Sequence, residues 1–315
     1  MTSDVDEHLA RLRAAPQPPM TLKALPAIRR RFAAALAAGY PPRPLADVAE
    51  AQASPGASGP RVRTYTPGGS GGSPVILFFH GGGFVLGSLD SHDGLCRDLA
   101  LRTGWRVVAV DYRLAPEAPH PAALDDALAA YDALPALTDG CGPVVVMGDS
   151  AGGWLAAQVA LRRPAALQVL LYPALDLSCG GASHAEFGTG YGLESPAIAF
   201  CYDCFAPTGP REDGELSPAL RTDLGHAPPA LLLVGGRDPL RDEAIAYAGR
   251  LAAAGVDVQL RVVAGMIHGF MTAPLVFARA APELERLVDD MSRALAVPLL
   301  TPTVGVRDAT VPLGS

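Results

Sequence analysis

The sequence is poor in charged residues and lacks any long apolar run. Charged residues make up 18% of the 315 residues, and the 25 lysines and arginines are scattered and outnumbered by 32 acidic residues. A nucleic-acid-binding surface needs clustered basic side chains, so the net charge of −7 argues against that class of partner. No stretch reaches the roughly 18 apolar residues that a membrane-spanning helix needs, so no membrane partner is expected either.

Cysteine is also scarce. Five cysteines, an odd number, do not indicate a disulfide framework. Cys201 and Cys204 form a C-x-x-C pair, but neither a second pair nor a nearby histidine completes a zinc set. The pair lies in an aromatic-rich stretch rather than beside a βαβ pattern, so apolar packing is the preferred interpretation and no metal is expected.

The N-terminal region shows no hydrophobic segment typical of a signal peptide. Residues 1–15 alternate charged residues with leucine. Arg29-Arg30-Arg31-Phe32 and the alanine-rich run behind it are similar to a twin-arginine export signal, but Gly39 and Pro41 cut the apolar stretch short. An amphipathic helix is therefore favoured here, and we expect a soluble, cytoplasmic protein.

Apolar residues make up 49% of the sequence, which suits a compact globular chain. Periodicity predicts an exposed strand and then a repeating order of buried strands and helices. The predicted strands are 61–66, 75–79, 106–110, 144–147, 167–172, 230–234 and 258–263. The predicted helices are 90–103, 121–134, 151–163, 241–254 and 282–296.

Strands that are apolar on both faces and separated by helices indicate an α/β fold, with a mostly parallel sheet covered on both sides. The alternation lapses between Pro173 and Pro229, so we predict an insertion. We expect a core over 51–174 and 226–300. N-terminal helices (1–50) and the insertion (175–225) would form a cap, and 301–315 an irregular tail.

The clearest motif is Gly148-Asp149-Ser150-Ala151-Gly152-Gly153, which follows a predicted strand and opens a predicted helix. This is the context of a nucleophile elbow, in which a serine sits on a sharp, strained turn. Residues two before and two after the serine must be small, so that strand and helix can approach. The helix N-terminus favours negative charge near the hydroxyl. The motif predicts Ser150 as a nucleophile.

A second glycine-rich motif, His80-Gly81-Gly82-Gly83-Phe84, directly follows the strand 75–79. Successive glycines let the backbone approach a substrate closely and point N–H groups at it, as oxyanion stabilisation requires. Such a loop accompanies the elbow in lipases and esterases. We interpret His80 as a structural residue of this loop.

A serine nucleophile needs a neutral imidazole as base, and seven histidines compete for that role. His268 is preferred because it lies in a glycine-flanked loop after the last predicted strand, and catalytic groups gather at the carboxyl ends of parallel strands. The others lie at the N-terminus, in the insertion, beside helix starts or in the glycine loop: His8, His184, His226, His92, His120 and His80.

The acid of such a site should lie between serine and histidine in the chain. Asp238 follows the strand 230–234 across Gly235-Gly236-Arg237, again at a strand's carboxyl end. Asp242 and Glu243 fit better at a helix start, where carboxylates suit the helix dipole. Asp238 is preferred, with Asp242 as the alternative.

Taken together, these motifs resemble the hormone-sensitive-lipase family of esterases, in its bacterial branch with G-D-S-A-G. Three further stretches, 111–117, 217–220 and 238–243, share the resemblance, which runs from about Arg61 to Met291. It implies an α/β-hydrolase fold with a helical cap. The implied triad is Ser150, Asp238 and His268, the implied oxyanion N–H groups are those of Gly82, Gly83 and Ala151, and Tyr112, Arg113 and Glu117 would brace the glycine loop.

The predicted function is hydrolysis of short-chain carboxylic esters through an acyl-enzyme, without a cofactor. Activity should rise as pH passes the pKa of the base, about 6.5 for an ordinary histidine. Phe84, Tyr191 and Phe205 are candidate substrate-pocket walls. An amidase or lactone hydrolase with the same triad remains an alternative. A non-catalytic receptor like the gibberellin receptors is another, although these lack the histidine. Family members often dimerise, which leaves a homodimer open.

Overall fold

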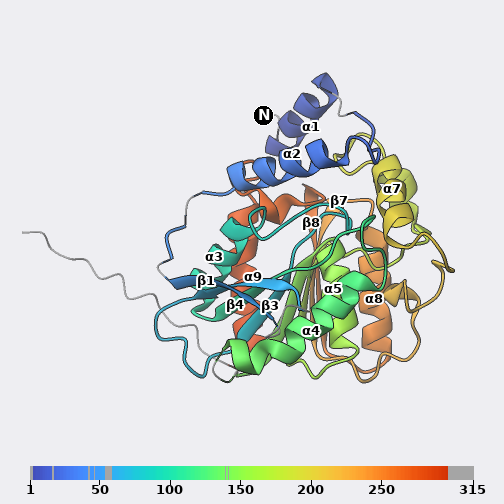
Figure 1. The fold of residues 1–315 in the computed structure, drawn as a ribbon. Helices are drawn as coiled ribbons and strands as arrows, with labels where there is room; N and C mark the ends of the chain where they lie inside the picture. The colour runs from blue at the N-terminus through green and yellow to red at the C-terminus, as the bar shows by residue number, and fades with distance from the viewer. Residues whose placement is uncertain are drawn as a thin grey trace, which may run out of the picture.

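The computed structural model describes residues 3–15, 18–41, 43–45, 47–53, 59–138, 140 and 142–296. Its strands form one sheet in the order β1-β2-β4-β3-β5-β6-β7-β8 (Figure 1). The strands are β1 (Asp47–Gln52), β2 (Arg61–Thr66), β3 (Val75–Phe79), β4 (Arg106–Asp111), β5 (Val144–Asp149), β6 (Leu167–Leu171), β7 (Ala230–Arg237) and β8 (Val258–Ile267). β2 pairs antiparallel with both β1 and β4, and the pairings from β4 to β8 are parallel.

The central strands are apolar at nearly every position, as expected for strands in the middle of a sheet. All five residues of β3 and all five of β6 are buried. Parallel neighbours need a crossover connection, and each crossover from β3 to β8 contains at least one helix. Helices therefore cover the sheet, and the mostly parallel α/β architecture predicted from the sequence is confirmed.

Among the helices that cover the sheet, α3 contacts α9 and α4 contacts α5, while α8 contacts β7 and β8. Their bounds are α3 (Asp93–Thr103), α4 (Ala122–Leu137), α5 (Ala151–Ala160), α8 (Arg241–Ala253) and α9 (Ala280–Leu295). α3 ends at Gly104, whose φ of 69° is the left-handed conformation that glycine adopts without strain. Among the described residues, no helix has the length and apolar character needed to cross a bilayer.

Four more helices belong to the N-terminal segment and to the predicted insertion. They are α1 (Asp4–Ala14), α2 (Leu25–Ala38), α6 (Ala182–Phe187) and α7 (Ser195–Phe205). Figure 1 shows α1, α2 and α7 together at the end of the molecule where β7 and β8 finish. Short 3-10 turns, η1 (Pro218–Leu220) and η2 (Phe270–Thr272), complete the described elements. The carboxyl ends of the strands are therefore overlaid by helices distant in sequence.

The ends of several strands differ from the sequence prediction, and β1 and β8 differ most. β1 was not predicted, because it lies at the sheet edge with five of its six residues exposed and carries no apolar pattern. β8 continues to Ile267, four residues beyond the predicted end, and its pairing with β7 shifts register between Gly235 and Arg237. This extension brings the chain directly to His268. The tail predicted over 301–315 lies outside the described residues.

Candidate active site

Ser150 occupies the sharp turn between β5 and α5. Its φ of 55° and ψ of −120° are strained for a residue with a side chain. A Cβ at Gly148 would lie 2.1 Å from the carbonyl oxygen of Gly152, and one at Gly152 would lie 2.0 Å from that of Phe79. The small residues expected on either side of the serine are therefore required by the close approach of strand and helix.

The structure brings Ser150, His268 and Asp238 together from three loops at the carboxyl ends of parallel strands. His268 Nε2 lies 3.0 Å from Ser150 Oγ, and His268 Nδ1 lies 2.9 Å from Asp238 Oδ2. The Asp238 carboxylate is fully buried, and its Oδ1 accepts a hydrogen bond from the Leu240 amide at 2.8 Å. The three side chains form one continuous hydrogen-bonded chain.

The surroundings of His268 favour its protonated form. Burial alone lowers the pKa of His268, but the charge and hydrogen bond of Asp238 outweigh burial, and the pKa is raised above 6.5. The Tyr172 ring packs edge-on against the imidazole, with 4.8 Å between ring centroids. The imidazole is therefore held in one orientation by a carboxylate on one side and an aromatic ring on another.

The alternative acid, Asp242, is engaged elsewhere. Its Oδ2 accepts a hydrogen bond from the Ser183 amide at 2.8 Å, and its Oδ1 pairs with Arg241 at 2.8 Å. These contacts attach the N-terminus of α8 to α6. Of the two candidate acids, the structure brings only Asp238 to the imidazole.

The glycine loop after β3 lies beside the elbow. Gly82 and Gly83 have φ values of 127° and 62°, and a Cβ at Gly82 would lie 2.4 Å from the Leu86 carbonyl oxygen. Both glycines are therefore required by the backbone path. The Gly81 amide donates to Asp149 Oδ1 at 2.8 Å, and the Tyr112 hydroxyl donates to the His80 carbonyl at 2.7 Å. The loop is thus hydrogen-bonded at its start.

The other two residues expected to brace this loop act at a greater distance. Arg113 pairs with Asp126 at the start of α4. Glu117 pairs with Arg29 of α2 at 2.8 Å, and the same guanidinium donates to the Val85 carbonyl at 2.7 Å, just beyond the glycines. Arg29 therefore connects the N-terminal helices to the glycine loop. The sequence pointed to Arg29 only as part of an arginine run, and not to this connection, because its partners are more than 50 residues away.

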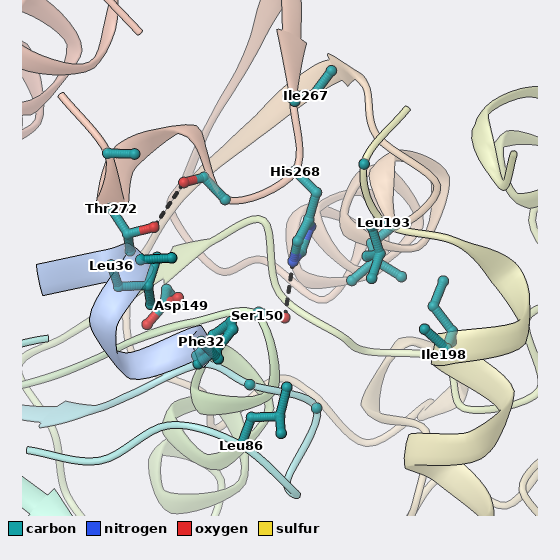
Figure 2. A pocket seen from close by; sticks show the side chains of 18 of the residues that line it. Phe32, Leu36, Leu86, Asp149, Ser150, Leu193, Ile198, Ile267, His268 and Thr272 are labelled. Atoms are coloured by element: carbon teal, nitrogen blue, oxygen red, sulfur yellow. Dashed lines mark hydrogen bonds between the residues drawn. The ribbon is translucent and has the colours of Figure 1, made fainter. Parts of the chain in front are cut away.

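A cavity of about 510 Å³ opens onto Ser150 and His268. Figure 2 shows the two side chains joined by their hydrogen bond, with apolar side chains from several elements around them. The apolar walls come from α1, α2, the glycine loop, the loop before α7, α7 and the segment after β8. They include Leu12, Met20, Phe32, Leu36, Leu86, Leu193, Ile198, Ile267, Val276 and Phe277. The space beside the serine is thus mostly apolar.

The three aromatic residues predicted as pocket walls do not line this cavity. Phe84 and Phe205 are buried and stack on each other, with 3.7 Å between ring centroids and both edge-on to Trp154. Tyr191 instead packs edge-on against Phe187 of α6. The stacked pair lies in the core, so the aromatic side chains that line the cavity are others, namely Phe32, Tyr202 and Phe277.

Among the described residues, no cluster of three or more His, Cys, Asp or Glu side chains could hold a metal ion. Cys201 lines the cavity, and burial raises the pKa of its thiol to about 12. Cys204, one turn further along α7, is half-buried, and burial raises the pKa of its thiol as well. A raised pKa keeps both thiols protonated, and a protonated thiol is a poor nucleophile.

Comparisons with known proteins agree with this geometry. Residues 76–272 match a family model described as the alpha/beta hydrolase fold. The chain is 41% identical to an ethyl acetate hydrolase of Pseudomonas putida, over 70% of this chain and 73% of that protein. It is 36% identical to the carboxylesterase NlhH of Mycobacterium tuberculosis, over 70% and 74% of the two chains.

Solved structures show the same likeness over nearly the whole chain. An ester hydrolase from the metagenome of Lake Arreo superposes with a TM-score of 0.87 at 32% identity, covering 94% of this chain and 100% of that one. The esterase of Pyrobaculum calidifontis gives a TM-score of 0.83 at 33% identity, with 92% and 97% covered. The chain belongs to the α/β-hydrolase family, in the hormone-sensitive-lipase-like group that contains these esterases.

Proposed function

We propose that the chain is a serine esterase that hydrolyses carboxylic esters through an acyl-enzyme on Ser150. The observation that carries this proposal is the unbroken hydrogen-bonded chain from Ser150 through His268 to Asp238 at the floor of an apolar cavity. The names of the relatives, which are ester hydrolases and carboxylesterases, support the same reaction.

In the first half of the reaction, Ser150 Oγ attacks the ester carbonyl while His268 Nε2 accepts the hydroxyl proton. Asp238 keeps the proton of Nδ1 on the far side of the ring and stabilises the imidazolium that forms. The 3.0 Å and 2.9 Å contacts are already within range for both roles. The imidazolium then gives its proton to the leaving alcohol, and the acyl group stays on Ser150.

In the second half, water enters as the nucleophile. His268 takes a proton from the water, the resulting hydroxide attacks the acyl carbonyl, and the imidazolium returns the proton to Ser150 Oγ as the carboxylic acid leaves. The imidazole ends the cycle neutral, in its starting orientation between Ser150 and Asp238.

Each tetrahedral intermediate carries a negative oxygen that needs hydrogen-bond donors. We assign this role to the backbone N–H groups of Gly82, Gly83 and Ala151. Gly82 and Gly83 line the cavity with Ser150, and Ala151 is the first residue of α5, where the helix dipole favours negative charge. Loss of one such donor typically costs on the order of 10² to 10³ in rate.

Short acyl and alcohol groups fit the proposal. The walls of the cavity are mainly aliphatic, so a substrate gains by burying hydrocarbon rather than charge. The ethyl acetate hydrolase among the relatives acts, by its name, on a small ester. An amidase or a lactone hydrolase would use the same triad, whereas a non-catalytic receptor is disfavoured because His268 is present and hydrogen-bonded to Ser150.

The predictions on organisation stand as further proposals. We propose that residues 1–50 and 175–225 form a cap over the core, supported by the presence of α1, α2 and α7 side chains in the cavity walls. A homodimer is proposed on the family resemblance, and the cytoplasmic location expected from the sequence stays a proposal. Cell fractionation and the molar mass in solution test these two proposals.

Hydrolysis of p-nitrophenyl acetate and butyrate tests the proposed function. We expect release of p-nitrophenol by the parent protein and loss of almost all release in Ser150→Ala, with an unchanged circular dichroism spectrum. Anilides and lactones of similar size distinguish an esterase from the other hydrolases. Undiminished turnover by Ser150→Ala would refute the assignment of the nucleophile.

A further inference from the structure

A second histidine, His92, lies next to the elbow without entering the cavity. We propose that His92 is a positioning residue that acts through the buried carboxylate of Asp149 to hold the glycine loop in place for oxyanion binding. This inference rests on the proposed function, because the loop matters only if an oxyanion forms there.

Asp149 connects the elbow to the glycine loop. It is the residue immediately before Ser150, it is only 4% exposed, and its Oδ1 accepts the Gly81 amide hydrogen bond at 2.8 Å. His92 Nε2 lies 3.2 Å from Oδ1 and 3.4 Å from Oδ2 of the same carboxylate. A single carboxylate therefore joins the serine turn, the first glycine of the loop and the imidazole.

The partners of His92 determine which atoms donate. The Ser91 hydroxyl oxygen lies 2.8 Å from the Ser88 carbonyl oxygen and 2.8 Å from His92 Nδ1, and it accepts a hydrogen bond from the Ser88 amide at 2.9 Å. Nε2 faces an ionised carboxylate, which can only accept. Nε2 therefore carries a hydrogen and donates it to the buried Asp149 carboxylate.

Other groups packed around this pair leave Asp149 ionised. Burial by itself raises the pKa of Asp149, but the charge and hydrogen bond of His92 and the Gly81 amide lower it, and the balance lies below the ordinary value. His80 stacks on His92 with 5.6 Å between centroids, and burial together with His92 lowers the pKa of His80 to about 4. His80 is therefore neutral beside the pair.

Ser91, His92 and Asp149 have the residue types of a second triad, but the arrangement does not favour one. Ser91 is 4% exposed, its hydroxyl is turned to a backbone carbonyl, and neither Ser91 nor His92 lines the cavity. Their hydrogen bonds lead through Asp149 to the Gly81 amide of the glycine loop. The chain of hydrogen bonds is suited to holding backbone rather than to attacking substrate.

Loss of His92 should act on the oxyanion in two ways. The buried carboxylate would lose the hydrogen bond from Nε2, and a buried charge that loses a partner destabilises its surroundings. A shift of the Asp149 carboxylate would move Gly81, whose amide donates to it, and with Gly81 the neighbouring oxyanion donors. Any negative charge left unbalanced would also oppose the negative oxygen that forms on the substrate.

The test compares His92→Gln with His226→Gln, a control whose imidazole contacts only the Leu161 carbonyl among the contacts described for the protein. For His92→Gln we expect kcat to fall by roughly 10- to 100-fold with KM changed by less than about threefold, as for a lost oxyanion contact. The control should keep both constants.

The infrared carbonyl frequency of a cinnamoyl acyl-enzyme reports hydrogen bonding in the oxyanion hole directly. The acyl-enzyme is trapped at acidic pH, where protonated His268 cannot act as a base. A shift to higher frequency is expected in His92→Gln, and a smaller shift in Ser91→Ala, which removes only the hydroxyl that orients Nδ1. Ser91→Ala keeps the test decisive if His92→Gln does not fold.

An unchanged carbonyl frequency in these variants, or a rise in KM at constant kcat, would overturn the positioning role. Failure of the proposed function is distinguishable, because the parent protein would then form no acyl-enzyme at all.

Discussion

Glu243 provides a prediction about how stability depends on pH, which follows from the burial of its carboxyl group. The side chain belongs to α8 and is 4% exposed. Its Oε1 accepts the Leu175 amide at 2.7 Å, and its Oε2 lies 3.4 Å from His184 Nε2 in α6. Burial raises the pKa of Glu243 from 4.5 to about 7, because these two partners only partly offset the loss of solvation.

The sign follows from the raised pKa. The folded protein holds this proton more tightly than the unfolded chain does, so the stabilising contribution is complete below pH 4.5 and is lost as pH rises through about 7. At 1.36 kcal/mol per pKa unit, the full loss is about 3 kcal/mol, and most of it, about 2 to 3 kcal/mol, falls between about pH 5 and pH 8.

Glu243→Gln removes the titration and keeps an amide oxygen for Leu175. The free energy of unfolding is measured in urea, by the fluorescence of the buried Trp105 and Trp154, at about pH 5 and pH 8. Between these values the variant should gain about 2 to 3 kcal/mol relative to the parent. Glu285→Gln, at an exposed position of α9, is the control and should show no such gain. Equal pH dependence of Glu243→Gln and the parent would refute the argument.

Three further predictions concern the active site and its surroundings. The pH profile of kcat/KM should rise with a midpoint above 6.5, because Asp238 raises the pKa of His268, and a midpoint at or below 6.5 would contradict that coupling. Gly83→Ala should lower the esterase rate by about 10², because its Cβ would lie 2.6 Å from Cys201 Sγ at a φ of 62°. Adding Cys201→Gly to this variant should restore part of the rate, and full activity of Gly83→Ala alone would show that the loop tolerates a side chain. Phe205→Ala should destabilise the fold by about 3 to 5 kcal/mol with little change in KM. Unchanged stability with a raised KM would mean that the ring contacts substrate.

The elements that position the candidate site could be predicted because their causes are local. The run over β3 is apolar throughout and that over β6 is apolar except for Gln168, since both faces of these strands are buried. Gly148 is required by a contact with Gly152, four residues away. β1 could not be predicted, because an exposed edge strand needs no apolar pattern. The sequence favoured Asp238 over Asp242 as the acid, but only the folded chain brings Asp238 to His268 and Asp242 to α6.

The cavity walls could not be predicted because they depend on how separate helices pack. Ile198 and Phe205 belong to the same helix and are both apolar, yet Ile198 lines the cavity while Phe205 stacks in the core. Likewise, nothing local to His92 indicates its partner, Asp149, which lies 57 residues away. Contacts of this kind follow from tertiary packing rather than from periodicity.

The central claim is that Ser150 is the nucleophile, and mass-spectrometric mapping of a fluorophosphonate adduct tests it most directly. The account predicts one modified peptide, with the phosphonyl group on Ser150 and with labelling that slows sharply in His268→Gln. An adduct on another residue, or none on a folded and ester-hydrolysing protein, would contradict it.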